Sequence, residues 1–317
     1  MYLNNFFRKR VNRLKEIKLQ LKYYSLFKHF LSNRQLCISM IDGRFSHGGL
    51  SDRLKGAISL YAYCKATGHE FRLCFSSPFN MVDYLQPNTY DWRIKEDETI
   101  NHSYWNVRVM IQTCEYKGER LFKLKTTKQL HYYNNQNIID RINEQYGTKY
   151  TYGELFNELF SPVPYLQQLI DHHTSLIGQQ YIASVFRFQQ LLGDFQEYDF
   201  PIMDTHERNV LMQLCREAII KLLLKYPDFK CLVTSDSTTF LNYISDIENV
   251  YVLPGEVVHM DVTQTAAYSV YMKSFLDLYM IAGAKEVYCI GTKAMYPSEF
   301  PLYAAKIRNI PFHRILI

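Results

Sequence analysis

An apolar run at residues 36–41 leads into a turn that contains Gly48 and Gly49, and an amphipathic run follows at residues 50–65. This order predicts a strand, a glycine turn and a helix. Because adjacent glycines let the backbone take positive φ angles and approach a ligand closely, the turn is either architectural or a ligand contact. A second apolar run at residues 71–75 completes a β-α-β unit, which requires a parallel sheet.

The second half of the chain repeats this alternation of short apolar runs and helical patterns. Strands are predicted at residues 181–188, 231–234, 250–253 and 286–290. Helices are predicted at residues 207–226, 237–244, 271–282 and 300–306. This alternation is typical of a doubly wound α/β fold, in which ligands bind at the carboxyl ends of the strands.

The region between these two halves carries weaker patterns. Residues 80–135 are irregular apart from a predicted strand at residues 106–113, and residues 138–180 are predicted to be helical. A chain of 317 residues is long enough for two domains. We therefore expect a basic helical segment and two Rossmann-like domains that face a cleft, at residues 1–35, 36–179 and 180–317.

The positive charge of the chain is concentrated before the first strand. The whole chain carries a formal net charge of +5, but residues 1–35 hold nine basic residues and one acidic residue. Nine minus one gives that segment a charge of +8, which leaves about −3 for the rest of the chain. This distribution does not indicate a nucleic-acid-binding protein, because the basic charge does not extend over the fold.

Apolar residues recur within this basic segment at steps of three and four residues. They are Phe6, Phe7, Val11, Leu14, Ile17, Leu21 and Tyr24. The pattern is typical of a basic amphipathic helix that lies on an anionic membrane surface. The alternative is a helix that packs on its own protein and exposes a basic face to solvent.

The cysteines and the hydropathy of the chain indicate a cytoplasmic protein. The seven cysteines form no CxxC pair, which is typical of reduced, buried thiols. No run of about 18 apolar residues predicts a transmembrane helix. No spacing of ligand residues indicates a metal site, so no metal is expected. A peripheral location on the inner face of the cell membrane would follow if the basic helix binds lipid.

Polar residues follow two predicted strands of the second half. Arg187 follows Ser184-Val185-Phe186 near the end of the first of these strands, and Asp194 ends the loop behind it. An arginine at a strand end can bind two phosphate oxygens, and Asp194 would orient it, although a surface ion pair is the alternative. Asp236 and Ser237 come after the next strand, where either is a good N-cap for the following helix or contacts a ligand.

Two further positions carry candidate chemistry. Thr292, between Gly291 and Lys293 at a strand end, suits a phosphate, although a plain turn is the alternative. Asp277 lies within an apolar helical pattern, where a carboxylate is costly to bury without partners. A guanine base offers two adjacent donors that one carboxylate can accept together. The alternative is that Asp277 faces solvent or caps a neighbouring loop.

Three segments in this order resemble the fucosyltransferase superfamily of GT-B glycosyltransferases, which includes α-1,6-, chitooligosaccharide and protein O-fucosyltransferases. Residues 48–54 are similar to its glycine-rich turn, and residues 184–195 to its H-x-R-x-G-D segment. Residues 274–292 resemble its last motif, a helix with a carboxylate followed by a strand that ends in small hydroxylated residues. The chain departs from the pattern at Phe186, where the family often has histidine, and in its longer loop before Asp194.

The resemblance implies a nucleotide-sugar donor, with GDP-fucose as the best candidate and another GDP-sugar or another nucleotide as the alternative. It implies that Arg187 neutralises the β-phosphate, Asp277 binds the guanine and Thr292 contacts a phosphate. The other positions expected to face the donor are His47, Gly48, Gly49, Asp194 and Asp236.

The implied reaction is an inverting, metal-independent transfer of the sugar to a hydroxyl group of a glycan or lipid-linked acceptor. Arg187 would stabilise the charge that grows on the leaving diphosphate. The candidates for a general base are Asp52, His47 and Asp42. A non-catalytic scaffold of the same fold is the alternative. An NAD-dependent oxidoreductase fits less well, because the first turn lacks G-x-G-x-x-G.

Overall fold

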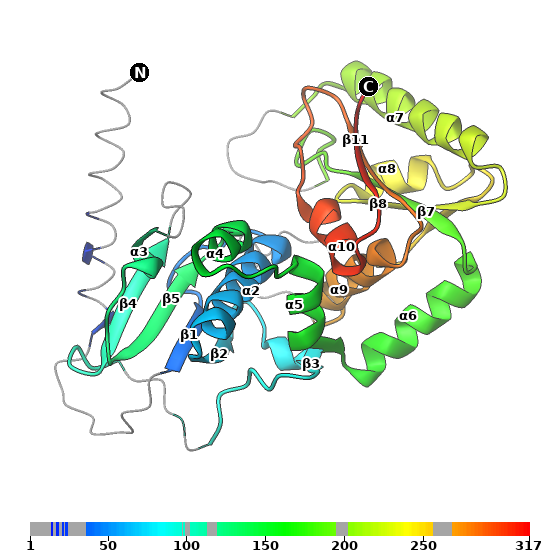
Figure 1. The fold of residues 1–317 in the computed structure, drawn as a ribbon. Helices are drawn as coiled ribbons and strands as arrows, with labels where there is room; N and C mark the ends of the chain where they lie inside the picture. The colour runs from blue at the N-terminus through cyan, green and yellow to red at the C-terminus, as the bar shows by residue number, and fades with distance from the viewer. Residues whose placement is uncertain are drawn as a thin grey trace. The chain divides into compact units, whose positions relative to one another are not determined.

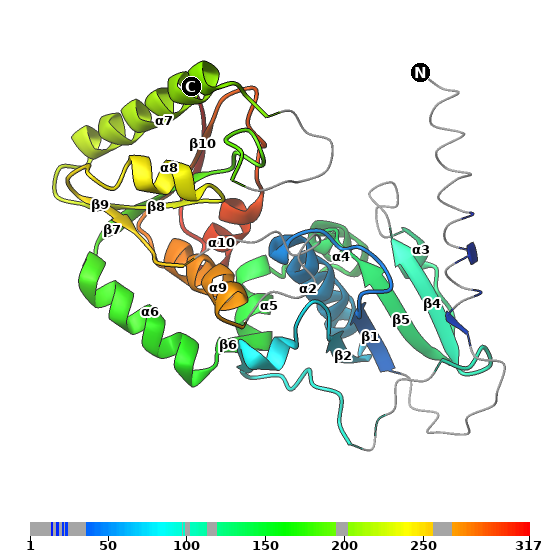
Figure 2. The same ribbon diagram turned by 180° about the vertical axis from the view of Figure 1, so that it is seen from behind.

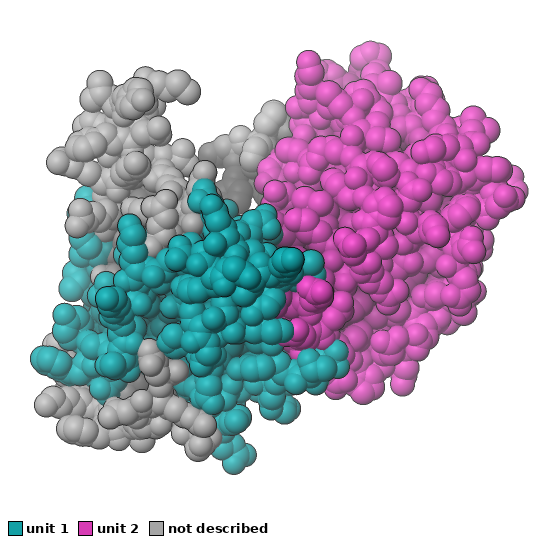
Figure 3. Space-filling model, viewed as in Figure 1, with its two compact units in different colours: residues 1–48, 52–79, 87–151 teal, residues 49–51, 80–86, 152–317 magenta. Residues whose placement is uncertain are grey.

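The computed structural model describes residues 14, 17, 18, 21, 23, 24, 36–96, 98, 102–112, 119–194, 202–255 and 268–317. The chain divides into two compact units, shown in two colours in Figure 3. The first unit comprises residues 1–48, 52–79 and 87–151, and the second comprises residues 49–51, 80–86 and 152–317.

The first unit contains a four-stranded parallel sheet with the strand order β2-β1-β5-β4. Its strands are β1 (Leu36–Ile41), β2 (Glu70–Phe75), β4 (Val107–Gln112) and β5 (Gln129–Asn134). The predicted strands at residues 36–41, 71–75 and 106–113 are confirmed. The predicted helix after the glycine turn is α2 (Leu50–Thr67). A Cβ atom on Gly56 would lie 1.8 Å from the carbonyl oxygen of Asn134, so only glycine lets α2 approach the end of β5 this closely.

Strand β5 lies inside the sheet although the sequence did not predict it. Every residue of Gln129–Asn134 is buried, yet the segment is not an apolar run. Two of its polar side chains hydrogen-bond each other within the sheet, because Oε1 of Gln129 lies 2.6 Å from Nε2 of His131. Burial, with smaller contributions from the nearby His102 and Arg44, lowers the pKa of His131 from its ordinary value of 6.5 to about 3.

We expect His131 to make the stability of the protein depend on pH. The unfolded chain protonates this histidine near pH 6.5 and the folded chain near pH 3, so its contribution is complete above pH 6.5 and is lost as the pH falls toward 3. Urea denaturation of the His131→Gln variant between pH 4 and 7 should therefore show a weaker pH dependence than the unchanged protein. His172→Gln, at an exposed position, is the control, and an unchanged slope for His131→Gln would contradict the prediction.

The second unit contains a five-stranded parallel sheet with the order β11-β10-β7-β8-β9. Its strands are β7 (Tyr181–Phe186), β8 (Lys230–Ser235), β9 (Val250–Val252), β10 (Val287–Gly291) and β11 (Phe312–Leu316). The first four were predicted. The fifth was not, because β11 is an edge strand whose side chains are largely exposed and follow no apolar pattern.

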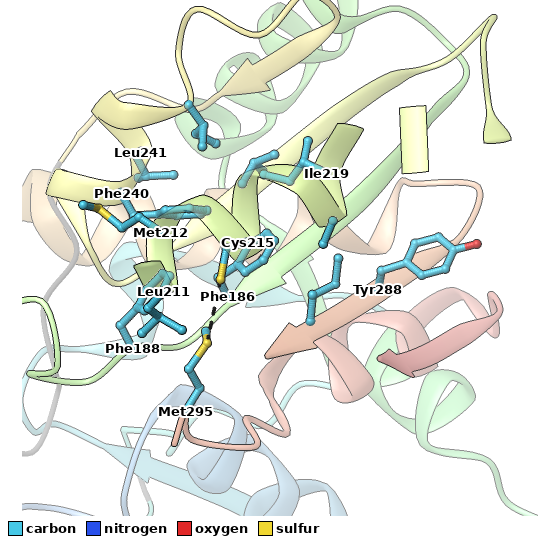
Figure 4. Packing of buried hydrophobic residues seen from close by; sticks show 14 of the residues in the cluster. Phe186, Phe188, Leu211, Met212, Cys215, Ile219, Phe240, Leu241, Tyr288 and Met295 are labelled. Atoms are coloured by element: carbon cyan, nitrogen blue, oxygen red, sulfur yellow. Dashed lines mark hydrogen bonds between the residues drawn. The ribbon is translucent and has the colours of Figure 1, made fainter. Parts of the chain in front are cut away.

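Helices cover both faces of this sheet. Figures 1 and 2 show α7 (Thr205–Lys225) and α8 (Thr238–Tyr243) on one face, and α9 (Tyr268–Ala282) and α10 (Phe300–Arg308) on the other. A cluster of buried aromatic and aliphatic side chains packs between the first face and its helices, as Figure 4 shows. In it, the rings of Phe186 and Phe188 both lie 4.9 Å from that of Phe240. This packing fixes the carboxyl end of β7 and the loop that follows it.

The boundary between the units differs from the expected one at residues 179 and 180. Helices α5 (Tyr152–Leu159) and α6 (Pro164–Ile177) belong to the second unit, because α5 packs on α10 and α6 packs on α9. The side-chain amide of Asn157 donates to the carbonyl oxygen of Ile307 at 3.0 Å. Residues 80–86 also join this unit, since the Tyr84 ring stacks on Phe275 at 4.8 Å. Short strands β3 (Leu85–Pro87) and β6 (Phe160–Pro162) pair with each other.

The first unit also contains the helices α3 (Glu119–Phe122) and α4 (Ile139–Tyr146). The 3-10 turn η1 (Met81–Asp83) belongs to the second unit. Among the residues that the structure describes, no helix is long and apolar enough to cross a bilayer.

Candidate functional site

The carboxyl ends of three neighbouring strands bring predicted site residues to one edge of the second sheet. Phe186, the last residue of β7, pairs in register with Ser235, the last residue of β8, so Arg187 and Asp236 leave the sheet side by side. Cys289 of β10 pairs with Val185 on the other side, and the same register places Gly291 beside residue 187. This is the edge at which open α/β sheets bind ligands.

Arg187 is held at this edge by an ion pair. Its Nη1 atom lies 2.8 Å from Oδ2 of Asp236, whose side chain is 2% exposed, while the Arg187 side chain is 18% exposed. The expected alternative, a surface ion pair, does not describe this geometry, because one partner is buried. A partly exposed guanidinium at a strand end is suited to binding an anion such as a phosphate.

Asp236 also holds the backbone of the loop behind Arg187. Its Oδ1 accepts the N–H of Phe188 at 2.8 Å and its Oδ2 accepts the N–H of Gln189 at 2.7 Å. Gln189 has a φ of 55°, in the left-handed region that non-glycine residues rarely adopt. Burial raises the pKa of Asp236, and the Arg187 charge and these N–H donors act against that rise. Asp236, therefore, is the residue that orients Arg187.

Asp194 does not pair with Arg187, so the prediction that it orients the arginine is wrong. Its carboxylate instead accepts the Ser237 hydroxyl at 2.6 Å and, from Thr239, the backbone N–H at 2.9 Å and the hydroxyl at 2.8 Å. Ser237 is the N-cap of α8 and accepts the N–H of Phe240 at 3.0 Å. The two carboxylates thus link the Arg187 loop to the β8–α8 connection at both of its ends.

Thr292 follows β10 at the same edge of the sheet and is partly exposed. Its hydroxyl oxygen accepts the N–H of Ala294 at 3.3 Å, as in a tight turn. This contact fits the plain turn that the sequence offered as an alternative, and it leaves the hydroxyl hydrogen available to a phosphate oxygen.

Asp277 is buried on α9 together with Lys273, which the sequence reasoning did not consider. The Lys273 ammonium lies 2.6 Å and 2.8 Å from the two carboxylate oxygens. The Lys273 side chain packs on Gly255, whose Cβ position would lie 3.3 Å from Cδ of the lysine. Because Gly255 follows β9, the pair lies beyond the carboxyl end of that strand. The alternative in which Asp277 faces solvent is therefore wrong.

In the first unit, the turn after β1 is tied down by side chains around it. Asp42 accepts the Tyr133 hydroxyl at 3.0 Å and the backbone N–H of Arg44 at 3.1 Å. Arg53 donates from Nε to the Gly48 carbonyl and from Nη1 to the Ser77 carbonyl, both at 2.9 Å. Arg53 therefore has an architectural role in holding the glycine turn against the end of β2.

The two glycines of this turn differ in what they require. Gly48 has a φ of 83°, and a Cβ atom there would lie 2.4 Å from Oδ2 of Asp52. Gly49 has no atom within 4 Å of its Cβ position among those described. Gly48 is thus required by the fold of the turn, whereas the space beside Gly49 is open.

The three candidates for a general base differ in their surroundings. His47 is fully buried, with its ring stacked 5.9 Å from that of Tyr133. Asp52 is ion-paired to Lys55 at 2.6 Å, and its side chain is partly exposed. Asp42 lies at the end of β1 with a largely buried carboxylate. Asp52 is thus the most accessible of the three, and His47 the least.

The described part of the chain shows no cluster of three or more His, Cys, Asp or Glu side chains that could hold a metal ion. At the carboxyl edge of the second sheet, Arg187 follows β7 and the exposed Lys293 follows β10.

No protein-family model and no curated protein sequence matches the chain. Solved structures do match it. NodZ alpha-1,6-fucosyltransferase co-crystallised with GDP aligns over 86% of this chain and 92% of its own, with a TM-score of 0.56 and 14% identity. A mutant of Arabidopsis thaliana FUT1 in complex with GDP aligns over 95% of this chain and 74% of its own, with a TM-score of 0.56 and 12% identity. POFUT1 in complex with GDP-fucose aligns over 90% of this chain and 99% of its own, with a TM-score of 0.53 and 9% identity.

The chain has the fold of the fucosyltransferase superfamily. The segments that carried the sequence resemblance lie after β1, after β7 and from α9 to the end of β10. The departures from the family pattern do not disturb the fold. Phe186 is a buried core residue, and the longer loop between Arg187 and Asp194 is held by hydrogen bonds at both ends.

Sequence reasoning missed Lys273 and the roles of Tyr133 and Asp236. A signal existed for Lys273, because its position four residues before Asp277 on a predicted helix places both side chains on one face. Tyr133 gave no signal, since its strand was not predicted. The ion pair between Asp236 and Arg187 depends on β7 and β8 being neighbours in the sheet, and no local sequence pattern predicts which strands are neighbours.

Proposed function

We propose that this protein is an inverting glycosyltransferase that transfers fucose from GDP-fucose to a hydroxyl group of a glycan. The observation that carries the proposal is Arg187, held by the buried Asp236 at the carboxyl edge of a parallel sheet. The fold adds support, because NodZ, FUT1 and POFUT1 structures of this fold were obtained with GDP or GDP-fucose.

The proposed chemistry needs positive charge where the donor breaks. As the bond between the sugar and the diphosphate lengthens, negative charge grows on the leaving diphosphate and the sugar becomes oxocarbenium-like. The Arg187 guanidinium would receive that charge by donating hydrogen bonds to the β-phosphate, and the Thr292 hydroxyl would donate to a neighbouring oxygen. The bond to the acceptor oxygen forms as the bond to the diphosphate breaks, and the acceptor proton passes to a base, for which Asp52 is the most accessible candidate.

The guanine base of the donor would bind at the Asp277 carboxylate. Lys273 uses two of the roughly four lone-pair sites that a carboxylate offers, so the remaining sites can accept the adjacent N–H donors of guanine. Uracil and cytosine lack this pair of donors in the same arrangement. The guanine preference is therefore a direct consequence of the proposed role of Asp277.

We expect GDP to raise the melting temperature of the protein more than UDP or CDP at equal concentration. A nucleotide at about 100 times its Kd stabilises the folded state by about 2.7 kcal/mol. A variant with both Lys273→Met and Asp277→Leu removes the two buried charges together and should fold, since such pairs can be replaced by apolar residues of similar size. It should lose the preference for GDP. A stronger response to UDP in the unchanged protein would contradict the assignment.

A non-catalytic nucleotide-binding scaffold of the same fold is the alternative, and it predicts GDP binding without turnover. Incubation with GDP-fucose and water alone distinguishes the two, because a transferase with its leaving-group arginine in place slowly releases GDP and free fucose. A scaffold binds GDP-fucose and leaves it intact. The Arg187→Ala variant is the background control for this release.

The acceptor in this proposal is a glycan or lipid-linked glycan presented at the cytoplasmic side of a membrane. Two features support it. Residues 1–35 carry a charge of +8, nine basic residues against one acidic, which favours an anionic membrane surface. The cysteines that the structure describes are free thiols, as in a reducing compartment.

A further inference from the structure

The N-terminal segment contains helical residues whose apolar side chains are exposed. Leu14 is 65% exposed, Ile17 is 45% exposed and Leu21 is 76% exposed. Their spacing of three and four residues places them on one side of the helix. The sequence left open whether this helix lies on a membrane surface or packs on its own protein. In the second case these three side chains would be buried, so their exposure favours the first.

Two tyrosines that follow these residues, Tyr23 and Tyr24, are fixed to the first sheet. Tyr23 is buried, and its hydroxyl is hydrogen-bonded to Nδ1 of His131. The guanidinium carbon of Arg44 lies 5.0 Å from the centre of the Tyr23 ring. Tyr24 accepts the backbone N–H of Val109 through its hydroxyl oxygen at 3.1 Å. This segment is therefore attached to the fold through Tyr23 and Tyr24, while Leu14, Ile17 and Leu21 before them face solvent.

An exposed aromatic turn adjoins this attachment. Its residues, Tyr104 and Trp105, come just before β4, and Trp105 is 60% exposed. The Tyr104 ring contacts the Tyr24 ring edge-on at 5.3 Å, which connects the turn to the end of the helical segment. The Lys128 ammonium lies 5.0 Å from the Tyr104 ring and donates to the Tyr104 carbonyl at 2.9 Å. Tyrosine and tryptophan are enriched where protein meets the boundary between lipid and water.

We propose that the helical residues Leu14, Ile17 and Leu21, together with the aromatic turn at Tyr104 and Trp105, form a surface that binds the interface of an anionic lipid bilayer. The apolar side chains supply the insertion, and the basic residues of segment 1–35 supply the attraction to anionic headgroups. A nucleic acid would also attract the charge, but it gives no reason for three exposed aliphatic side chains on one side of a helix. The inference stands on the first unit and does not depend on the sugar-transfer chemistry.

The two tryptophans of the chain make this proposal directly measurable. Trp92 is 2% exposed and Trp105 is 60% exposed, so only Trp105 can change its surroundings when the surface meets lipid. The full-length protein should therefore show a blue shift of its tryptophan emission with vesicles of phosphatidylcholine and phosphatidylglycerol. It should show none with pure phosphatidylcholine vesicles. The shift should weaken as salt is raised, because the attraction to the headgroups is screened.

Sedimentation with the same anionic vesicles tests the apolar side chains. The variant with Leu14→Ser and Leu21→Ser should bind about tenfold or more weakly, since two apolar side chains no longer enter the interface. Trp105→Ser should also weaken binding. Leu224→Ser is the matched control, because Leu224 on α7 is as exposed as Leu21, at 76%, and it should bind vesicles like the unchanged protein.

Several outcomes would overturn the proposal. One is vesicle binding without any change in Trp105 emission, and another is equal loss of binding in Leu224→Ser. A third is binding of duplex DNA with no binding of anionic vesicles, which would assign the basic segment to a different partner. Sugar transfer to a soluble acceptor should be unchanged in the lipid-binding variants, so failure of this proposal is distinguishable from failure of the transferase assignment.

Discussion

Replacing Arg187 by alanine should lower kcat for sugar transfer by about 100- to 1000-fold, the effect of removing one preorganised donor from a developing negative charge. The residue lies at the carboxyl edge of the sheet with its guanidinium partly exposed and its orientation fixed by Asp236. Without it, the charge that grows on the leaving diphosphate loses the guanidinium that the ion pair with Asp236 holds at this edge. Steady-state kinetics with GDP-fucose and an acceptor glycan would measure the change in kcat.

Two variants make this result specific. Arg187→Lys keeps the charge but cannot form the bidentate hydrogen bonds of a guanidinium, so it should retain more activity than Arg187→Ala but less than the unchanged protein. Arg216→Ala removes an arginine of the same unit that pairs with an exposed carboxylate, Asp246, at 2.6 Å, and it should leave kcat unchanged. Full turnover by Arg187→Ala would show that the donor does not bind at this edge, and the proposed function would then fail.

Replacing Asp236 by asparagine should reduce both activity and stability. Removing one partner of a buried ion pair costs about 3–5 kcal/mol in proteins, and the partial exposure of Arg187 places this case near 3 kcal/mol. The amide oxygen of asparagine can still accept one backbone N–H of the loop. The loss of the carboxylate charge, however, removes the ion pair that orients the Arg187 side chain. We expect kcat to fall as Arg187 loses its orientation. On the same samples, urea denaturation would measure the loss of stability and steady-state kinetics the loss of activity.

A double-mutant cycle separates the positioning role of Asp236 from a purely structural one. If Asp236 acts through Arg187, Asp236→Asn should cost little further activity in the Arg187→Ala background, because the effects of coupled residues are not additive. Additive effects on kcat would mean that Asp236 supports the fold alone. Asp246→Asn, in the exposed pair with Arg216, is the control for loss of a carboxylate.

The order of elements in both units could be predicted because it rests on local patterns. The apolar run of β1, the glycine turn and the amphipathic pattern of α2 lie next to one another in the chain. Strands β7, β8, β9 and β10 are short apolar runs between helical patterns, and they were found for the same reason. Strand β5 was not predicted because its buried side chains are partly polar, and Gln129 and His131 hydrogen-bond each other inside the sheet. Strand β11 was not predicted because it is an edge strand with largely exposed side chains.

The partner of Arg187 could not be predicted, since it depends on which strands are neighbours. Asp194 is close to Arg187 in the sequence and was the natural choice as its partner. The parallel pairing of β7 with β8 instead brings Asp236, from a distant part of the chain, within 2.8 Å of the guanidinium. Asp194 is carried to the far end of the loop, where it meets the beginning of α8.

The sequence by itself determined the alternation of strands and helices and the residue types at the strand ends, because hydrophobic periodicity and turn chemistry are local properties of the chain. It also determined the excess of basic charge before the first strand. Only the tertiary structure decided the order of the strands, the exchange of roles between Asp194 and Asp236, and the burial of Asp277 with Lys273. The first two are set by the pairing of strands far apart in the sequence. Lys273 and Asp277 are neighbours on one turn of α9, but their burial is set by the segments that pack on that helix. In each case, burial makes a polar group take the partner that the neighbouring strand or helix turn presents.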